Sequence, residues 1–325
     1  MNTAPQKFGL IPETPDPRDF SQEKVFGAFT AEELPQGDFF VSDPLKIKDQ
    51  GPTDFCTGYA AAAVLEDHEH MELSGPYIFA TAKRLLAEKT GNPEEYKKWG
   101  LQLRDVCEAV VKVGALQEDL SPYKTDQQDY LRDELANPKN WGDDYDMLAG
   151  DHRQASYFNV DGALDRFDNF RSALARGKAS GNSILTGVLW RYSWKDAPGG
   201  IIPVDYDPAE GGEPHAIKIF GQIEIKHEHD QYGCLEDGSC DAKDPGLHLV
   251  AQLSNSERIG DKGLFYIPRN VINKEFVYGA KQFSDMSKDE ALNLIDHGLK
   301  VNDNRFYKLM VVLWHLFTGK LGIRK

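Results

Sequence analysis

The sequence predicts an α+β protein with two lobes, a helical N-terminal lobe and an antiparallel β C-terminal lobe with a cleft between them. The first observation behind this prediction is that helical patterns fill the first half of the chain. Alanine-rich sequence predicts a helix that begins near Cys56 and ends at the Gly75-Pro76 pair. Further helices are predicted at residues 76–89, 103–113 and 164–176, and Gly114 and Gly177 end the last two.

The second observation is that strand-forming residues dominate the second half. Strands are predicted at residues 183–192, 215–225, 247–253 and 263–267, and the second of these turns at Gly221. Residues 288–317 return to a helical pattern with apolar residues on one face, which predicts extra C-terminal helices.

The first 34 residues predict an extended arm, because their prolines remove backbone donors and discourage helix. Apolar residues at Phe8, Leu10, Ile11 and Phe20 predict an ordered strap on the domain, and a regulatory flap across the cleft is the alternative. The sequence therefore predicts three parts: an extended arm at residues 1–34, the main domain at 35–280 and a helical extension at 281–325.

Composition excludes several classes of protein. A net charge of −15 argues against binding to nucleic acid or to an anionic membrane, since both need a basic face. The N-terminal sequence has no apolar run after a basic segment, so no secretory signal is predicted. Four cysteines in 325 residues favour a reducing compartment such as the cytoplasm.

Cys56 has the surroundings that a nucleophilic thiolate needs. It lies where a helix is predicted to begin, and the unpaired N–H groups there favour negative charge. Gln50 precedes it by six residues, so its side-chain amide and the Cys56 backbone N–H can form an oxyanion hole. A free cysteine alone is more often a small buried hydrophobe, so the prediction depends on the combination.

Two further residues complete a catalytic set. His215 follows a glycine-rich turn at the start of a predicted strand, where an imidazole can take the thiol proton and return it to a leaving amine. Asn255 follows a later strand, and its carbonyl can accept the far imidazole N–H and fix the ring. Read singly, these residues are an edge-strand histidine and a turn asparagine.

In this order the residues resemble a known family. The stretch from Ile47 to Ala60 resembles the nucleophile segment of the papain-like cysteine peptidases (family C1). Further segments resemble the family in the same order: Leu34-Pro35, Leu73–Tyr77, Leu103–Tyr123, Pro214-His215-Ala216, Asn255-Ser256 and Gly260–Ile267. The leader, Phe8–Pro12 with Asp16–Phe20, resembles that of bacterial, archaeal and phage members.

The resemblance implies a papain-like fold and hydrolysis of peptide bonds in a peptide or protein substrate, with no metal or organic cofactor. Cys56 is then the nucleophile, His215 the general base and acid, Asn255 the orienting residue and Gln50 the oxyanion donor. The Gly-Gly pair that binds substrate in the family is reduced here to Trp99-Gly100. A location in the cytoplasm or in a virus particle is expected.

Departures from the family pattern support a second hypothesis, a papain-like scaffold with weak or no catalysis. Glu257 replaces the tryptophan that shields the His–Asn hydrogen bond, and the glycine pair is reduced to Trp99-Gly100. The neighbouring disulfide cysteine of the family is also absent, which fits a non-secreted setting. The tail offers Phe306, Leu309, Leu313 and Phe317 for self-association or partner docking, or for packing on its own domain. A transglutaminase-like or cell-wall amidase fold is a third hypothesis, and Asn255 counts against it because those sets usually end in Asp or a second His.

An acidic insertion separates His215 from Asn255. It carries His227, His229, Cys234 and Cys240, for which a plain loop, a zinc site and a Cys234–Cys240 disulfide stay open.

Overall fold

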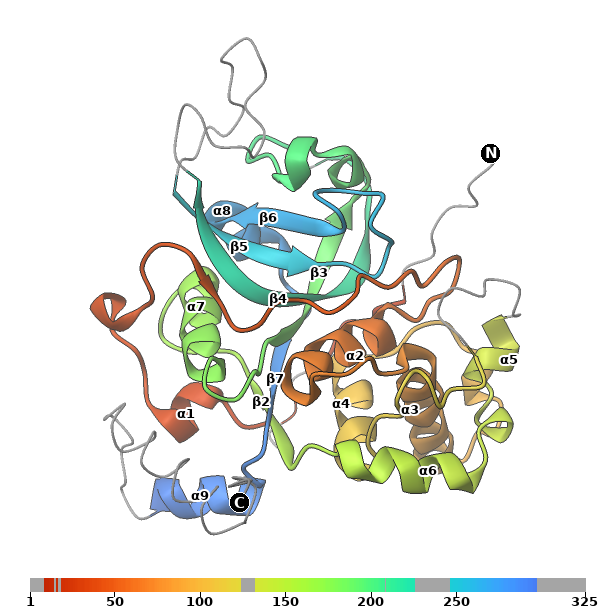
Figure 1. Ribbon diagram of the computed structural model, residues 1–325. Helices are drawn as coiled ribbons and strands as arrows, with labels where there is room; N and C mark the ends of the chain where they lie inside the picture. The colour runs from red at the N-terminus through yellow and green to blue at the C-terminus, as the bar shows by residue number, and fades with distance from the viewer. Residues whose placement is uncertain are drawn as a thin grey trace, which may run out of the picture.

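The computed structural model describes residues 9–14, 16, 19–123, 132–207, 209–225 and 246–296. Its two lobes appear in Figure 1 as a sheet at the top and a group of helices at the lower right. The helical lobe contains α2 (Cys56–Glu69), α3 (Gly75–Thr90) and α4 (Leu103–Lys112). The mixed architecture confirms the predicted α+β class, with a helical first half and an antiparallel sheet.

All strand pairs within the described residues are antiparallel, and the strand order is β2-β7-β3-β4-β5-β6, with β1 paired to β4. The strands are β1 (Phe39–Phe40), β2 (Ser156–Asn159), β3 (Ile184–Arg191), β4 (Gly212–Ile225), β5 (Gly246–Gln252), β6 (Leu264–Pro268) and β7 (Ala280–Ser284). The four predicted strands correspond to β3, β4, β5 and β6. The turn predicted at Gly221 is wrong, because β4 continues to Ile225 and only bulges between Ile219 and Gly221.

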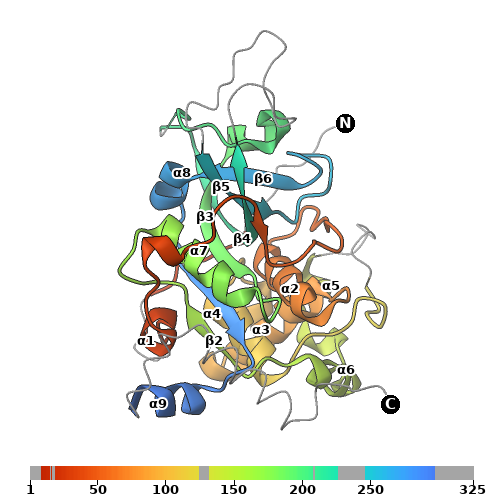
Figure 2. The same cartoon turned by 60° about the vertical axis from the view of Figure 1, so that its left-hand side comes forward.

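The sheet has a different partner on each face, because neighbouring side chains of a strand point in opposite directions. Leu185 belongs to a core shared with α2, α3 and α4, whereas Ile184 belongs to a core that contains residues of α7 (Arg166–Gly177) and α8 (Arg269–Glu275). Figure 2 shows α8 beside the sheet, and in Figure 1 α7 lies on the other side of β4 and β7 from α2. The face of the sheet that carries Leu185 therefore packs against α2, the helix that begins at Cys56.

The first long helix ends earlier than predicted. α2 stops at Glu69, where His70 adopts a left-handed conformation with φ of 56°. The prediction that Gly75-Pro76 ends this helix is wrong, because these two residues begin α3. Ser74 caps α3 by accepting a hydrogen bond from the Tyr77 backbone N–H.

Short elements account for most of what the sequence pattern did not predict. The remaining described helices are α1 (Gln22–Phe26), α5 (Arg132–Ala136), α6 (Asp143–Ala149) and α9 (Lys288–Asp296). α1 and a 3₁₀ turn at Ala31–Glu33 interrupt the predicted arm, and α9 lies in the segment predicted to be helical. β7 begins at Ala280 and ends at Ser284, so the sheet extends beyond the domain boundary predicted at residue 280. The division of the chain into three parts stays a prediction. The tail residues Phe306–Phe317 lie outside the described residues. Among the described helices, none is both long and apolar enough to cross a membrane.

A buried ion pair joins the two lobes, and its loss should destabilise the fold. Lys218 Nζ on β4 lies 2.6 Å from Asp67 Oδ1 on α2, and the two side chains are 1% and 0% exposed. We expect Lys218→Met to lower the free energy of unfolding by about 3–5 kcal/mol, because it leaves Asp67 buried without its cation. Urea denaturation measures this, with Lys195→Met as the control, because Lys195 forms only an exposed pair with Asp196 and should cost under about 0.5 kcal/mol. Equal losses in the two variants would contradict the prediction.

Candidate active site

Cys56 is the first residue of α2 and is fully buried. Backbone groups of Ala216 in β4 and of Gly9 in the arm face its thiol and act to lower its pKa. Burial raises the pKa of the Cys56 thiol to about 11, and these backbone groups offset only part of that rise. The nucleophile candidate therefore lies between the helical lobe, the sheet and the arm, in its neutral form at pH 7.

His215 lies in β4, immediately before the residue whose backbone meets Cys56. It pairs with Val188 of β3, and its ring centroid is 6.3 Å from that of Trp190. The side chain is fully buried, and burial lowers the pKa of His215 to about 3. The imidazole is thus neutral at pH 7, the form that can accept a proton from a thiol.

The loops that carry Gln50 and Asn255 are bonded to each other. Asp49 and Asn255 form an antiparallel bridge, and the Gln50 backbone N–H donates to Ser254 O at 2.8 Å. The Ser254 hydroxyl donates to Gln50 Oε1 at 2.6 Å. Lys218 pairs with Gln252, the last residue of β5, so His215 and Asn255 each lie three residues along the chain from this pair.

Hydrogen bonds at both its oxygen and its nitrogen fix the Gln50 side-chain amide. Its Nε2 donates to Thr53 O at 2.8 Å, which occupies one of the two amide hydrogens. The second hydrogen has no acceptor within the part of the chain that the structure describes. Cys56, as the first residue of a helix, also has a backbone N–H without an intrahelical acceptor. These are the two donors that an oxyanion hole beside Cys56 needs.

The predicted substrate-binding pair, Trp99-Gly100, reaches the same region. Gly100 has a left-handed backbone with φ of 69°, and a Cβ on it would lie 2.6 Å from the Gly9 carbonyl oxygen. The arm therefore approaches this backbone more closely than a larger residue would permit. The structure thus places Gly100 against Gly9, whose backbone also faces the Cys56 thiol, whereas Trp99 is 44% exposed.

The arm covers the candidate site as an added strand-like segment. Leu101 N–H donates to Gly9 O at 2.8 Å, and Ile11 N–H donates to Leu101 O at 2.9 Å. Between them, Leu10 is 5% exposed and belongs to the same apolar core as Cys56 and Ala216. The described part of the arm is therefore packed on the domain, as predicted for Leu10, and its Gly9 backbone faces the Cys56 thiol, whereas Phe8 lies outside the described residues.

Two cations anchor the next part of the arm. Arg104 Nη2 on α4 lies 2.5 Å from Asp19 Oδ2, and Lys281 Nζ on β7 lies 2.9 Å from Glu13 Oε2 and 3.0 Å from Asp19 Oδ2. Burial alone would raise the pKa of Asp19, but the hydrogen bonds and charges of Arg104 and Lys281 lower it overall. The sequence pattern had no signal for these pairs, because their partners are far apart in the chain.

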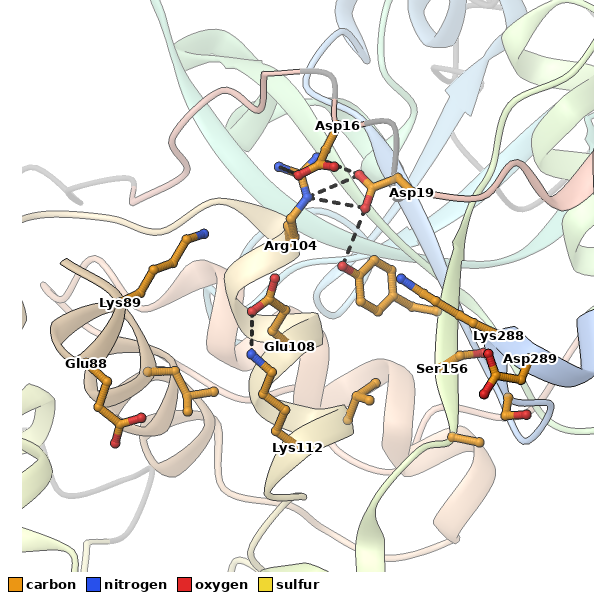
Figure 3. A pocket seen from close by; sticks show the side chains of 15 residues that line it. Asp16, Asp19, Glu88, Lys89, Arg104, Glu108, Lys112, Ser156, Lys288 and Asp289 are labelled. Carbon is orange, nitrogen blue, oxygen red and sulfur yellow. Dashed lines mark hydrogen bonds and ion pairs between the residues drawn. The ribbon is translucent and has the colours of Figure 1, made fainter. Parts of the chain in front are cut away.

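A cavity of about 760 Å³ adjoins this anchor, away from the cysteine. Figure 3 shows Arg104 and Asp19 on its wall, with Glu108 and Lys112 of α4 forming a separate pair. Both cationic and carboxylate side chains line the cavity, and neither Cys56 nor His215 lines it.

The zinc and disulfide alternatives fall on residues outside the described part of the chain, since His227, His229, Cys234 and Cys240 all lie between residues 226 and 245. Among the residues that the structure does describe, no three His, Cys, Asp or Glu side chains are arranged to hold a metal ion.

Solved structures resemble this architecture over most of the chain. Xylellain, a cysteine protease from Xylella fastidiosa, matches with a TM-score of 0.60 and 19% identity, over 88% of this chain and 98% of its own. Procathepsin B S9 from Trypanosoma congolense matches with a TM-score of 0.56 and 13% identity, over 85% of each chain. The fold is that of the papain-like cysteine proteases.

Bromelain from Ananas comosus, solved with the E64 inhibitor, has the same papain-like fold, with a TM-score of 0.50 and 13% identity over 77% of this chain and 99% of its own. Identities this low establish the fold and leave the activity to be argued from the site. No family model and no curated protein sequence matches the chain. The bacterial, archaeal or phage type stays a prediction.

Proposed function

We propose that this protein is a cysteine-type peptidase that hydrolyses peptide bonds through an acyl-enzyme. One observation carries the proposal: the Cys56 thiol, at the start of a helix, faces the backbone of Ala216, the residue next to His215. The papain-like fold supports it, and the bonded Gln50 and Asn255 loops supply the two accessory roles.

The chemistry follows from the placement of these groups. His215 accepts the Cys56 proton, and the thiolate attacks the peptide carbonyl carbon. The second amide hydrogen of Gln50 and the Cys56 backbone N–H stabilise the oxyanion. The imidazolium protonates the leaving amine, water then hydrolyses the thioester, and Asn255 keeps the ring oriented.

The substrate is an extended peptide or protein segment. The backbone of Leu101 already pairs with the arm through one donor and one acceptor, which is how an exposed strand edge binds an extended chain. A substrate that uses this edge must displace residues 9–11. The described arrangement is therefore a covered form, in which burial holds Cys56 as the thiol and His215 as the neutral imidazole.

Stoichiometric labelling of Cys56 by an epoxide inhibitor at near-neutral pH is the expected result for a peptidase. Mass spectrometry of the labelled protein locates the residue. His215→Ala should slow labelling by at least about a hundredfold, because general-base assistance contributes factors of this size. Cys107 is a matched internal control, because it is also buried and burial raises its pKa well above the usual range. Labelling of both cysteines, or no effect of the histidine variant, would remove the support for an activated thiol.

A papain-like scaffold without catalysis is the second candidate. The observation that favours it is the complete burial of Cys56, together with the rise of its pKa to about 11. In that case self-association or partner docking would replace hydrolysis. Folded protein that never labels at Cys56, even after the arm is displaced, would favour this candidate.

A further inference from the structure

A buried carboxylate stands two residues before the candidate nucleophile. Asp54 is 0% exposed and accepts a hydrogen bond from the Gly100 backbone N–H at 2.5 Å. Arg132 Nε lies 2.8 Å from Asp54 Oδ1, and Arg132 Nη2 lies 2.9 Å from Asp54 Oδ2. This two-pronged pair fixes the planar guanidinium to the loop that leads into Cys56.

Nη1 of Arg132 also binds Asp133 Oδ1 at 2.9 Å, and further donors bind the segment that contains the predicted substrate-binding pair. They reach the carbonyl oxygens of Tyr96 and of Lys98, the latter at 2.7 Å. The centre of the guanidinium also lies 5.2 Å from the centroid of the Trp99 ring. Arg132 therefore connects the loop before Cys56 with the backbone and the ring of residues 96–99.

Lys83 of α3 holds the same segment from another side. It is 1% exposed, and its ammonium donates to the carbonyl oxygens of Lys98 and Gly100, both at 2.8 Å. Burial lowers the pKa of Lys83 to about 8, although the neighbouring Asp54 charge favours the ammonium. Two cations and one carboxylate thus surround the backbone of residues 98–100.

Stability alone does not account for such a cluster, since well-packed apolar residues in place of buried charges are often equally stable or more so. What the cluster holds is the backbone next to Leu101, the edge that pairs with Gly9 and Ile11 of the arm. A peptide on that edge can present a bond to Cys56 only if the edge keeps a fixed position relative to the nucleophile loop.

We propose that Asp54, Arg132 and Lys83 are positioning residues that hold the Gly100–Leu101 edge in line with Cys56, so that an extended peptide pairs with it in reacting register. This inference rests on the proposed peptidase function. The cluster ties the nucleophile loop to its neighbouring segment without a covalent bond. It therefore provides rigidity in a chain that lacks the disulfide cysteine its family carries beside the nucleophile.

Arg132→Lys tests the proposal in the full-length chain, because lysine keeps the charge next to Asp54 but lacks the planar fork. Two reagents are compared at Cys56: iodoacetamide, which needs only the thiol, and a peptidyl epoxide, which also needs the edge. We expect the ratio of epoxide to iodoacetamide rate constants to fall at least about tenfold. Because both reagents require the same uncovering of the thiol, the ratio does not report how often the arm leaves. Hydrogen exchange of the Gly100, Leu101 and Ile11 amides should accelerate at least about tenfold.

Arg269→Lys is the matched control. Arg269 of α8 makes a comparable two-pronged contact with Asp168 of α7, at 2.9 and 3.0 Å. It should leave the ratio and the three amides within about twofold of the parent. Asp54→Asn, which keeps the side-chain shape, gives the same measurements if Arg132→Lys does not fold. A ratio and exchange rates within about twofold of the parent in the folded cluster variant would overturn the proposal. If Cys56 of the parent protein reacts with neither reagent, the proposed peptidase function fails. Unchanged amide exchange in the cluster variant would overturn the positioning role independently of that result.

Discussion

Replacing Leu10 with aspartate should raise the rate at which iodoacetamide alkylates Cys56 by at least about a hundredfold. Leu10 is 5% exposed in the apolar core that contains Cys56, and its neighbours Gly9 and Ile11 hold the arm to Leu101. An unpaired carboxylate at this place costs several kcal/mol when the arm is seated, and about 2.7 kcal/mol already corresponds to a hundredfold shift in an equilibrium. The substitution changes none of the candidate catalytic residues. Time-resolved mass spectrometry of the alkylated protein measures the rate.

Ile11→Asp is the matched control for this experiment. Ile11 is the next residue, carries a similar side chain and undergoes the same change of charge, but it is 41% exposed. Its carboxylate can remain in water while the arm stays seated, so the alkylation rate should change less than about threefold. Equal rates for the two variants would show that the arm does not control access to Cys56. The same outcome would leave burial within the domain as the reason for the raised thiol pKa.

The sequence could predict the parts of this site that depend on local pattern. Cys56 was placed at a helix start and His215 in a strand because alanine content, glycine turns and strand formers act over short stretches. The end of α2 was misplaced, because a Gly-Pro pair begins a helix as readily as it ends one. The short strands β2 and β7 were missed, since four or five residues carry too little periodicity to distinguish a strand from a loop.

Long-range ion pairs escape this kind of reasoning altogether. Asp54 and Arg132 are 78 residues apart, and Asp19 and Lys281 are 262 residues apart. Nothing in the neighbourhood of either partner indicates the other, because a charged residue is by default a solvated one. Yet these pairs hold the backbone of residues 98–100 and the described part of the arm. The residue types of the candidate site could therefore be predicted from sequence, whereas the contacts that position and cover it could not.

The electrostatic state of the covered site leads to a dependence of stability on pH. Burial lowers the pKa of His215 from 6.5 to about 3. Below about pH 6.5 the unfolded chain binds a proton at this histidine that the folded protein does not bind, so the free energy of unfolding must fall as the pH falls. One pH unit corresponds to about 1.4 kcal/mol, so His215 alone should remove up to about 3 kcal/mol between pH 6.5 and pH 4.5. Asp19, whose pKa is lowered from 3.8, loses its contribution only at more acidic pH, outside this window.

Urea denaturation at pH 7, 5.5 and 4.5 measures this dependence, and His215→Gln should make it shallower by the amount that His215 contributes. His70→Asn is the control, because His70 is exposed and asparagine tolerates its left-handed backbone. It should leave the pH dependence of the parent unchanged. Parallel curves for the parent and His215→Gln would mean that His215 titrates in the folded protein near its ordinary pKa, and thus that the ring meets water.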